Sequence, residues 1–399
     1  KAYDLNKNSY EIINNLAGFF REEGEYKKSI SLYLKALEIN PQNHTIINNL
    51  AKAYYDINEL EKAKEHCLKA LKLKNDDGDI QKFLSLIYLR QQNYSAGWKY
   101  FDGRLKLSDF VERNSSINKI RKKLLYENKL NKKSKILVLR EQGIGDEILY
   151  GTMYADLLKS CNDVTIECDK RLKNIFCNSF PNYKKSFIEF GEISLNENLL
   201  SKYDVAIYAG SLGKFFRTKI TDFNNGCYLY AENNLIEKYK RELNSLDKKI
   251  NIGISWKSFK NRYANEKSLM LEDFGNIFEN QDCNFINLQY GDIGDEIEIY
   301  NRKFKKNIVT IKNLDLLNDF DGLASILKNL DLFITVSNST AHLAGSLGIK
   351  TLLIRPKNHA IFHYWNQINN KTPWYETIKF IDKNQIISEK NLINKYLTS

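Results

Sequence analysis

Chemistry is first suggested by a glycine-rich turn that ends in an acidic residue. Gly143-Ile144-Gly145-Asp146 lies between a short apolar run and a helical stretch. Glycines let the backbone turn sharply into a helix and approach a ligand closely. Asp146 then falls in the first turn of that helix and is expected to point into a cleft. Two interpretations stay open: a carboxylate that takes part in a reaction, or a cap that accepts backbone N–H bonds.

A second polar segment ends a predicted strand and begins a helix. It consists of Ser337, Asn338, Ser339, Thr340, Ala341 and His342. Ser339 and Thr340 can cap this helix while its unbonded N–H groups face a diphosphate. Negative charge builds on a departing nucleotide in the transition state, so fixed donors at this place favour group transfer. His342, one of five histidines, either donates to the phosphate or satisfies a contact in the core.

A third segment follows a predicted strand at its carboxyl end, where ligands of open α/β sheets bind. It comprises Gln289, Tyr290, Gly291 and Asp292. Gly291 allows close approach of a ligand, Tyr290 could stack on a base, and Asp292 could bind ribose hydroxyls. The alternative is a structural turn without a ligand.

The elements that must position these residues follow from the apolar pattern after residue 134. Short continuous apolar runs, typical of buried parallel strands, alternate with helical stretches. The expected strands are 135–140, 164–168, 204–209, 251–256, 284–290, 332–336 and 351–355, with helices at 148–159, 172–180, 271–278 and 340–347. This alternation predicts doubly wound parallel sheets. A strand-turn-helix start in each half predicts two Rossmann-like domains that face each other across a cleft.

The N-terminal part shows an internal repeat instead. Two sets of seven residues correspond to each other at an offset of 34 positions. The first set is Leu16, Ala17, Phe20, Ser29, Tyr33, Ala36 and Pro41, and the second is Leu50, Ala51, Tyr54, Ala63, Cys67, Ala70 and Asn75. That period is typical of tetratricopeptide (TPR) repeats, which are helix pairs whose stacking creates a groove for an extended peptide. A third copy begins near Gly78. Exposed faces of such arrays commonly pair, so a homodimer is one expectation.

The composition narrows the function classes. The chain has 399 residues, 43% hydrophobic and 27% charged, which supports packed cores and excludes a disordered or collagen-like protein. The net charge of +11 is spread without a block of like charges, so no nucleic-acid partner is expected. The lysine excess either solvates the surface or weakly attracts anionic ligands such as sugar nucleotides.

Several chemistries are disfavoured by residue spacing. No zinc-ligand spacing, Walker A motif or G-x-S-x-G motif occurs, and the Gly143-x-Gly145 turn lacks the third glycine of dinucleotide-binding turns. The six cysteines form no CxxC pair, and there is no apolar run of about 18 residues. A reducing, cytoplasmic location without a membrane span is therefore expected. Because the chain begins with Lys1 rather than Met, a missing upstream segment is left open.

The segment Arg140-Glu-Gln-Gly-Ile-Gly-Asp-Glu147 resembles the first turn of heptosyltransferase-like glycosyltransferases of family 9, above all the branch with N-terminal TPR repeats. Further segments agree in order with that branch, over roughly residues 95–382: Gly97-Trp98…Tyr100…Arg104, Thr165–Arg171, Ile252–Trp256, Asn287–Asp292, Ile334–Gly348 and Pro373-Trp374-Tyr375. The resemblance implies a GT-B fold, a nucleotide-sugar donor, and inverting transfer with no obligatory metal and no other cofactor. Bacterial members with TPR repeats are implicated in glycosylating proteins, including flagellins.

The resemblance also implies roles for single residues. In similar enzymes the acid matching Asp146 is the proposed general base, which is needed because a sugar or protein hydroxyl is a weak nucleophile until its proton is removed. Ser337 stands where heptosyltransferases usually carry an aspartate associated with holding the heptose. That departure makes ADP-heptose a doubtful donor.

A lysine near the start of the second half offsets the donor phosphate charge in similar enzymes. Lys267 fits this place slightly better than Lys257, and two further cations lie between them, Lys260 and Arg262. Any of the four could instead belong to the solvated surface. Four late aromatic residues are expected to pack the C-terminal half or to line the acceptor entry: Tyr364, Trp365, Trp374 and Tyr375.

The sequence thus predicts a TPR α-solenoid followed by a GT-B fold of two Rossmann-like domains. The expected parts are TPR repeats at 1–107, a linker with a short helix at 108–134, an acceptor-side domain at 135–240 and a nucleotide-sugar-side domain at 241–399. The expected function is an inverting glycosyltransferase that moves a sugar to a hydroxyl of a protein held by the TPR groove. The alternatives are a non-catalytic TPR scaffold and another GT-B enzyme, such as a sugar-nucleotide epimerase.

Overall fold

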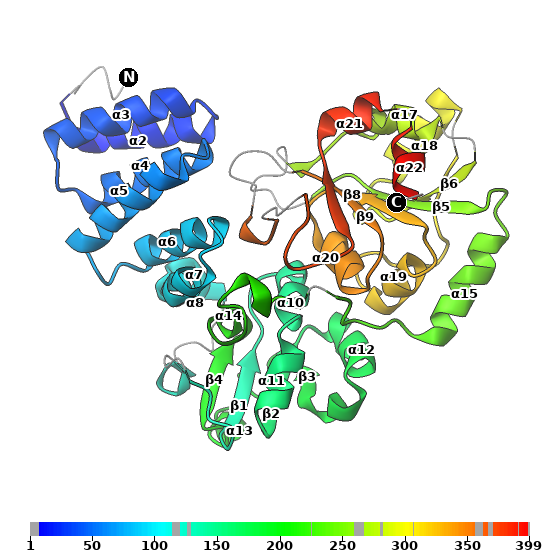
Figure 1. The fold of residues 1–399 in the computed structure, drawn as a ribbon, viewed down its shortest axis with the longest axis horizontal. Coiled ribbons are helices and arrows are strands. Elements are labelled where there is room, and N and C mark those ends of the chain that lie inside the picture. Colours follow the sequence, from blue (N-terminus) through cyan, green and yellow to red (C-terminus); the bar gives the residue numbers. More distant parts are fainter. Residues whose placement is uncertain are drawn as a thin grey trace. The chain divides into compact units, whose positions relative to one another are not determined.

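The computed structural model divides the chain into two compact units. It describes residues 8–113, 120–125, 129–224, 226–258, 267–279, 282–305, 307–355, 362–365, 370–389 and 391–397. The first unit holds the described residues up to 113 together with 217–222 and 362–363, and the second unit holds the others (Figure 1).

The first unit is built from three helix pairs. They are α2 (Tyr10–Glu22) with α3 (Tyr26–Ile39), α4 (His44–Asp56) with α5 (Leu60–Leu73), and α6 (Gly78–Arg90) with α7 (Tyr94–Phe101). The first helices begin at residues 10, 44 and 78 and the second helices at 26, 60 and 94, so the pairs repeat at the predicted offset of 34. A 3-10 helix at Asp102–Lys106 and α8 (Ser108–Arg113) follow. The predicted helical repeat is confirmed, including its third copy.

The same capping device starts the first helix of every repeat. Ser9, Asn43 and Asp77 each accept, through a side-chain oxygen, the backbone N–H of the residue three positions later, at 3.1 to 3.3 Å. Small side chains then let the two helices of a pair approach each other. Ala17 is fully buried, and its carbonyl accepts the Ser29 hydroxyl at 2.8 Å.

Two short segments from far along the chain complete the first unit. The Trp98 indole N–H donates to the Arg217 carbonyl at 2.8 Å, across 119 residues of sequence, and the ring packs edge-to-face on His363 with centroids 5.9 Å apart. Burial lowers the pKa of His363 to about 3, so this imidazole is neutral at ordinary pH. The predicted domain limits assigned both segments to the α/β region, because such distant contacts leave no local pattern in the sequence.

The second unit begins with a four-stranded parallel sheet. Its strands follow the order β3-β2-β1-β4 and comprise β1 (Lys135–Leu139), β2 (Asp163–Cys168), β3 (Phe187–Glu189) and β4 (Val205–Tyr208). In β1, Leu137 pairs with Thr165 on one side and with Ala206 on the other. The connecting helices include α10 (Ile144–Gly151), α11 (Tyr154–Ser160), α12 (Lys170–Ser179), α13 (Glu197–Leu200) and α14 (Gly213–Phe216).

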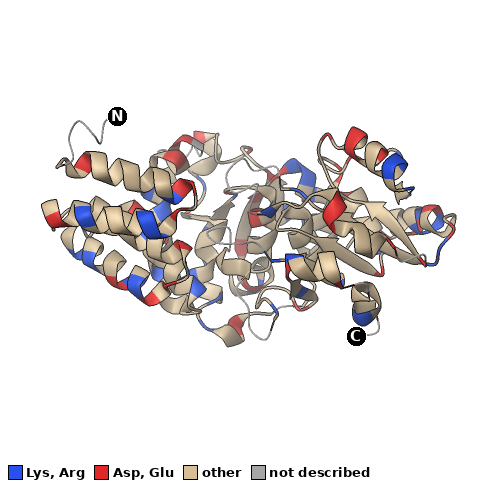
Figure 2. Ribbon diagram, turned by 90° about the horizontal axis from the view of Figure 1, so that it is seen from above, with Lys and Arg blue, Asp and Glu red and all other residues tan. Residues whose placement is uncertain are grey.

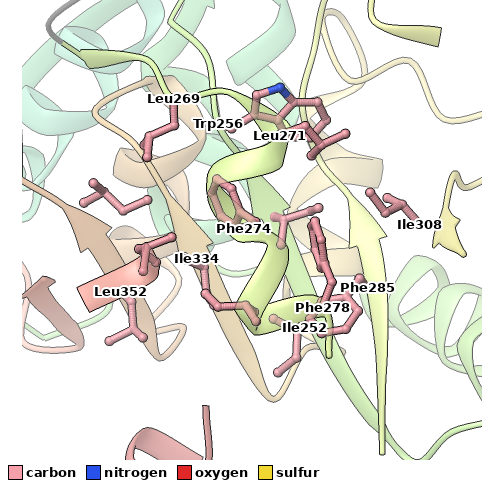
Figure 3. Close-up of a cluster of buried hydrophobic side chains, with 14 of the residues drawn as sticks. Ile252, Trp256, Leu269, Leu271, Phe274, Phe278, Phe285, Ile308, Ile334 and Leu352 are labelled. Atoms are coloured by element: carbon pink, nitrogen blue, oxygen red, sulfur yellow. The ribbon is translucent and has the colours of Figure 1, made fainter. Parts of the chain in front are cut away.

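A six-stranded parallel sheet follows, in the order β10-β9-β8-β5-β6-β7. Its strands are β5 (Ile250–Ser255), β6 (Cys283–Asn287), β7 (Ile308–Val309), β8 (Leu332–Thr335), β9 (Thr351–Ile354) and β10 (Ile378–Ile381). The helices are α15 (Asn233–Asn244), α17 (Gly275–Phe278), α18 (Gly294–Phe304), α19 (Phe320–Leu327), α20 (Ser339–Ser346), α21 (Lys383–Ser388) and α22 (Leu392–Leu397). On one face, Ile252, Phe285 and Ile334 form a core with Phe274 and Trp256 (Figure 3). The two predicted Rossmann-like sheets are thus confirmed.

The observed elements differ from the predicted ones in detail. The helix expected at 148–159 begins at Ile144 and is interrupted after Gly151, and the Thr152 hydroxyl donates to the Leu149 carbonyl at 2.7 Å at that interruption. Strands β3 and β7 were not predicted, because they have only three and two residues, and the four-residue strand β10 was missed as well. The boundary predicted between residues 240 and 241 lies inside α15.

Within the predicted linker the structure describes short pieces only. These are α8 and a 3-10 helix at Arg121–Lys123, after which Leu124 bridges to Ala206 of β4. Positively and negatively charged residues are interspersed along the chain (Figure 2). Among the described helices, none has the length and apolar character needed to cross a membrane.

We expect Gly97→Ala to destabilise the first unit. A Cβ on Gly97 would lie 2.6 Å from the side chain of Leu89 and 3.2 Å from its backbone nitrogen, and Leu89 is fully buried. Overpacking of this kind costs about 1–3 kcal/mol. The measurement is the free energy of unfolding of the full chain by chemical denaturation.

Gly18→Ala is the matched control, because Gly18 is also helical but its added Cβ would meet only the Tyr33 hydroxyl, at 3.6 Å. Helix propensity then predicts a gain of about 0.5–1 kcal/mol. Equal stability of the two variants would contradict the packing of α7 described here.

Candidate functional site

A cavity of about 200 Å³ in the second unit is lined from both sheets. Its lining residues are Gly143, Ile144, Gly145, Asp146, Arg171, Ser258, Lys267, Tyr290, Leu316, Leu317, Phe320, Ser337, Asn338, Ser339, His342 and Tyr364. Most of them follow the carboxyl ends of strands, where parallel α/β sheets place their ligands. The cavity therefore gathers residues from three of the segments that the sequence singled out.

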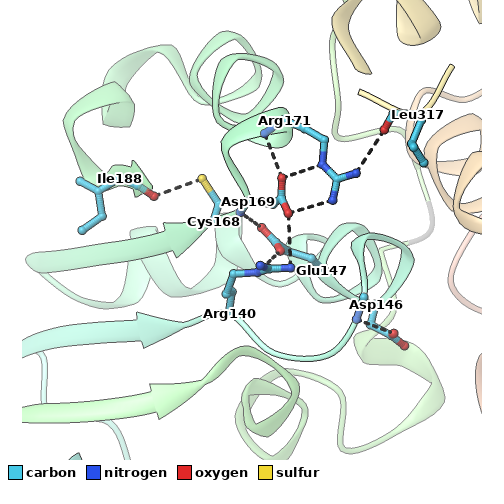
Figure 4. Close-up of polar contacts among 9 residues, drawn as sticks. Arg140, Asp146, Glu147, Cys168, Asp169, Arg171, Ile188 and Leu317 are labelled. Carbon is cyan, nitrogen blue, oxygen red and sulfur yellow. Dashed lines mark hydrogen bonds and ion pairs between the residues drawn. The ribbon is translucent and has the colours of Figure 1, made fainter. Parts of the chain in front are cut away.

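The first wall is the turn that leads from β1 into α10. Asp146 is the third residue of that helix, and one of its carboxylate oxygens accepts the Gly143 N–H at 3.2 Å (Figure 4). The capping bond proposed from the sequence is therefore present, although Asp146 caps from inside the helix. Asp146 also lines the cavity, so both interpretations of this residue are compatible with its position.

Gly145 is favoured by the close approach of two helices. A Cβ at this position would lie 3.0 Å from Cδ2 of His342 and 3.4 Å from Cα of Ser339. The first turn of α10 thus meets the first turn of α20 so closely that a side chain at position 145 would be in tight contact with α20. The glycine serves helix contact and cavity shape together.

The second wall is the start of α20. Asn338 is its N-cap, and Oδ1 of Asn338 accepts the Ala341 N–H at 3.0 Å. Nδ2 of Asn338 donates to the Ser255 hydroxyl at 2.8 Å, which ties the helix to the end of β5. Ser339 lines the cavity, whereas Thr340 and Ala341 are buried and do not line it.

His342 lies against aromatic rings on the cavity wall. Its Nδ1 is 3.0 Å from the Tyr375 hydroxyl, and its ring stacks on Trp365 with centroids 4.6 Å apart. Tyr364 meets His342 edge-to-face at 5.0 Å. His342 thus satisfies core contacts and faces the cavity as well, so the two alternatives stated for it do not exclude each other.

The Ser337 side chain is hydrogen-bonded to a buried aromatic residue. Its hydroxyl accepts the Trp365 indole N–H at 2.8 Å, and both residues are buried. The serine oxygen therefore satisfies the buried indole N–H.

The two candidate lysines lie in different surroundings. Lys267 is only 7% exposed and lines the cavity. Lys257 pairs with Glu296, whose other oxygen accepts the Trp256 indole N–H at 3.1 Å, and Lys257 does not line the cavity. The preference for Lys267 agrees with this geometry. Lys260 and Arg262 lie outside the described residues.

Only part of the segment 289–292 lines the cavity. Tyr290 lines the cavity, but the side chain of Gln289 is buried and points into the protein, and exposed Asp292 is not part of the lining. Oε1 of Gln289 accepts the backbone N–H groups of Trp256 and Lys257 at 2.8 and 2.6 Å. Gln289 therefore has the structural role that the sequence analysis gave as the alternative for this segment. Gly291 has a φ of 101°, a left-handed conformation that favours glycine.

The sequence analysis gave no role to several lining residues: Arg171, Ser258, Leu316, Leu317 and Phe320. For Arg171 the signal was its place in the segment Thr165–Arg171, directly after a predicted strand. Tyr364, which was expected to pack the C-terminal half or to line the acceptor entry, packs on His342 and lines the cavity. Burial and then the nearby Asp146 charge raise its pKa far above the usual value, so its hydroxyl stays protonated.

Behind the first wall lies a cluster of two arginines and two carboxylates (Figure 4). Glu147, which is completely buried, accepts from Nε of Arg140 at 3.0 Å and from the backbone N–H of Asp169 at 2.7 Å. Burial raises the pKa of Glu147 to about 7 despite its bonds to Arg140. Burial also opposes the charge of Asp169, but hydrogen bonds from Arg171 hold the pKa of Asp169 below its usual value.

The chain is similar over part of its length to several known proteins. Protein FlbA of Caulobacter vibrioides is 23% identical over 260 residues, which are 61% of this chain and 42% of FlbA, so the chain spans less than half of that relative's length. A glycosyl transferase of family 9 from Veillonella parvula has 12% identity and a TM-score of 0.45, with 68% of this chain and 95% of that one covered. The ADP-heptose lps heptosyltransferase II of E. coli has 11% identity and a TM-score of 0.46, with 66% and 98% covered.

Family models match the N-terminal helices. Residues 20–58 match a TPR repeat and residues 44–77 match a tetratricopeptide repeat. These residues run from the end of α2 to the turn after α5. The helices in this part of the first unit are therefore tetratricopeptide repeats.

Proposed function

We propose that the protein is an inverting glycosyltransferase that moves a sugar from a nucleotide-sugar donor to an acceptor hydroxyl. The observation that carries the proposal is the cavity in which Asp146 of α10 faces the same space as Lys267 and the N-terminus of α20. A carboxylate suits proton removal, and a cation beside a helix N-terminus suits a phosphate. The resemblance of residues 140–147 to the first turn of family 9 enzymes supports the same assignment.

In the proposed reaction, Asp146 takes the proton of the acceptor hydroxyl. The hydroxyl oxygen attacks the anomeric carbon from the face opposite the nucleotide, and the bond from that carbon to the phosphate oxygen breaks. The nucleotide leaves with the electron pair of the broken bond. Inversion at the anomeric carbon follows from this single displacement.

The departing nucleotide needs positive charge beside it. Lys267 supplies a full charge, and the first turn of α20, capped by Asn338, supplies a helix N-terminus. His342, also on the lining, can donate to a phosphate oxygen. With these groups the proposed reaction requires no obligatory metal and no other cofactor.

The acceptor in this proposal is a protein segment held by the TPR unit. Helix α4 lies against both α2 and α6, so the first helices of successive repeats form one continuous wall. Asparagines occupy equivalent positions on that wall, with Asn15 exposed and Asn49 half-buried. Side-chain amides can bond an extended peptide backbone whatever its sequence. A cytoplasmic location and a homodimer belong to the same proposal, and none of the six cysteines is in a disulfide, as a reducing compartment requires.

We expect Asp146→Asn to lower the turnover of a nucleotide sugar by about 10²–10⁴-fold, because the general base is lost. Asparagine keeps an oxygen that can accept the Gly143 N–H, so α10 should stay capped and the donor should still bind. The measurement is nucleotide release from UDP-, GDP-, ADP- and CMP-sugars by the purified full chain, with donor binding followed by calorimetry.

Asp163→Asn is the matched control, since Asp163 is an exposed acid at the start of β2, away from the cavity lining. It should turn over the donor at the wild-type rate. Equal turnover by Asp146→Asn would rule out Asp146 as the base. Absence of binding and release for every donor would favour a non-catalytic scaffold.

We expect the double substitution Asn15→Ala and Asn49→Ala to raise the KM for a protein acceptor about thirtyfold without changing hydrolysis of the donor. Each lost hydrogen bond to a peptide is worth about 1 kcal/mol, and each 1.4 kcal/mol is tenfold in affinity. The measurement is transfer of labelled sugar to protein in a lysate fraction, at varied acceptor concentration.

Asn244→Ala, an exposed change at the end of α15, should alter neither quantity. An unchanged KM in the double variant would exclude these asparagines from acceptor binding. Transfer to a free glycan at full rate would point to a glycan acceptor, whereas conversion of a sugar nucleotide without any transfer would point to the epimerase alternative.

A further inference from the structure

The first-sheet wall of the cavity carries a fixed cation that the proposed reaction has not used. We infer that Arg171 binds a phosphate oxygen of the nucleotide from this wall, opposite Lys267, which makes it a further donor-binding residue. The inference rests on the proposed function, because it names a ligand of the same cavity. Among the described lining residues, Arg171 and Lys267 are the two with Lys or Arg side chains, and they come from different sheets.

The guanidinium of Arg171 is held in one orientation. Its Nε donates to Oδ1 of Asp169 at 2.9 Å and its Nη2 to Oδ2 at 3.0 Å, which is a two-bond fork. Asp169 is fixed in turn as the N-cap of α12, where Oδ1 also accepts the backbone N–H of Arg171 at 3.0 Å. A flexible side chain is thereby fixed before any ligand arrives, which lowers the entropy cost of binding.

A second layer holds the fork itself. Nη2 of Arg140 lies 3.4 Å from Oδ2 of Asp169, while Nε of Arg140 donates to Glu147 at 3.0 Å. Two arginines therefore share two carboxylates. Since burial raises the pKa of Glu147 to about 7, part of its negative charge is absent near neutral pH, and the cluster then carries a net positive charge.

The exposed edge of Arg171 faces the cavity. Its side chain is 25% exposed, and Nη1 donates to the carbonyl of Leu317 at 3.1 Å, on the loop before α19. This bond joins the end of β2 to a loop of the second sheet across the cavity lining. A guanidinium has five N–H donors, and three bonds leave N–H groups of Nη1 and Nη2 for a ligand.

The positively charged groups on the two walls indicate which class of ligand the cavity can bind. Arg171, Lys267 and the N-terminus of α20 line one cavity of about 200 Å³, so a diphosphate is the kind of ligand that can contact both walls. Planar guanidinium groups match phosphate oxygens better than ammonium groups do. A nucleoside diphosphate is thus the class of ligand that would meet both cations at once.

The test is calorimetric titration of the full chain with UDP, GDP, ADP, CMP and inorganic pyrophosphate. Arg171→Gln should weaken the tightest of these ligands about ten- to a hundredfold, because a charge-assisted bond is lost. Arg171→Lys should fall between wild type and Arg171→Gln, since it keeps the charge and loses the fork. Asp169 is expected not to contact the ligand but to hold Arg171, so Asp169→Asn should also weaken binding. That result would identify Asp169 as a positioning residue.

Two controls separate a phosphate contact from a structural effect. Arg302→Gln removes an exposed arginine paired with Glu298 on α18 and should leave every affinity unchanged. The matching nucleosides without phosphate should bind wild type and Arg171→Gln equally. The affinity for pyrophosphate should also depend less on salt in Arg171→Gln than in wild type.

Each remaining outcome overturns a defined statement. If Arg171→Gln leaves all affinities unchanged while Lys267→Gln weakens them, Arg171 is not a phosphate ligand and the proposed function stands. If Arg171→Gln weakens nucleoside and nucleotide equally, its role is structural and the inference fails. If no probe binds wild type, both the inference and the proposed donor site fail.

Discussion

The contact between the first turns of α10 and α20 is the constraint on which the candidate site depends. Gly145 lies so close to His342 and Ser339 that a single added carbon would be in tight contact with both. Both helices begin at this contact, so two helix N-termini, each with partial positive charge, face one space. Asp146 and Asn338 cap these ends. The cavity is the space that remains between two such ends, which explains why its chemistry suits an anion.

The second wall is rigid because its polar groups are bonded to one another. Ser255 accepts from Asn338 and donates to Gln289 at 3.1 Å, and Gln289 accepts two backbone N–H groups beyond β5. These groups are buried, and a buried polar network is stable only when its members are satisfied. Strands β5 and β6 are thus tied to the N-terminus of α20. A ligand bound there meets a surface that needs little rearrangement.

Much of this fold could be predicted because its signals are local. The offset of 34 predicts helix pairs, and continuous apolar runs predict parallel strands. The predicted bounds of β1 and β5 differ from the observed ones by one residue. Asp146 and the start of α20, which line the cavity, could be picked out from the sequence because a turn before a helix is also a local feature. The cap of α20 was predicted wrongly, since it is Asn338 and not Ser339 or Thr340. The direction in which several side chains point could not be predicted from the sequence.

A glutamine after a strand can face a ligand or a neighbouring strand, and only the three-dimensional partner decides, as it does for Gln289. Lys257 was uncertain for the same reason, because Glu296 lies 39 residues away in sequence. Arg171 was overlooked as a site residue although its fixing partner, Asp169, is only two residues away, because no pattern shows that a guanidinium held by its neighbour also borders a cavity. The packing of Trp98 on Arg217 and His363 likewise has no local signature.

The neighbours Asp146 and Glu147 show how one helical turn can both present and anchor a reactive group. Asp146 lines the cavity, whereas Glu147 is completely buried and holds Arg140 and the backbone of Asp169. Consecutive residues of a helix point about 100° apart, so an anchor behind the wall fixes the direction of the group in front. Removing one member of a buried ion cluster is strongly destabilising, because the partners are left uncompensated. The cluster that orients Arg171 therefore also sets the rotation of α10, and the acid and the cation on the first wall depend on the same four side chains.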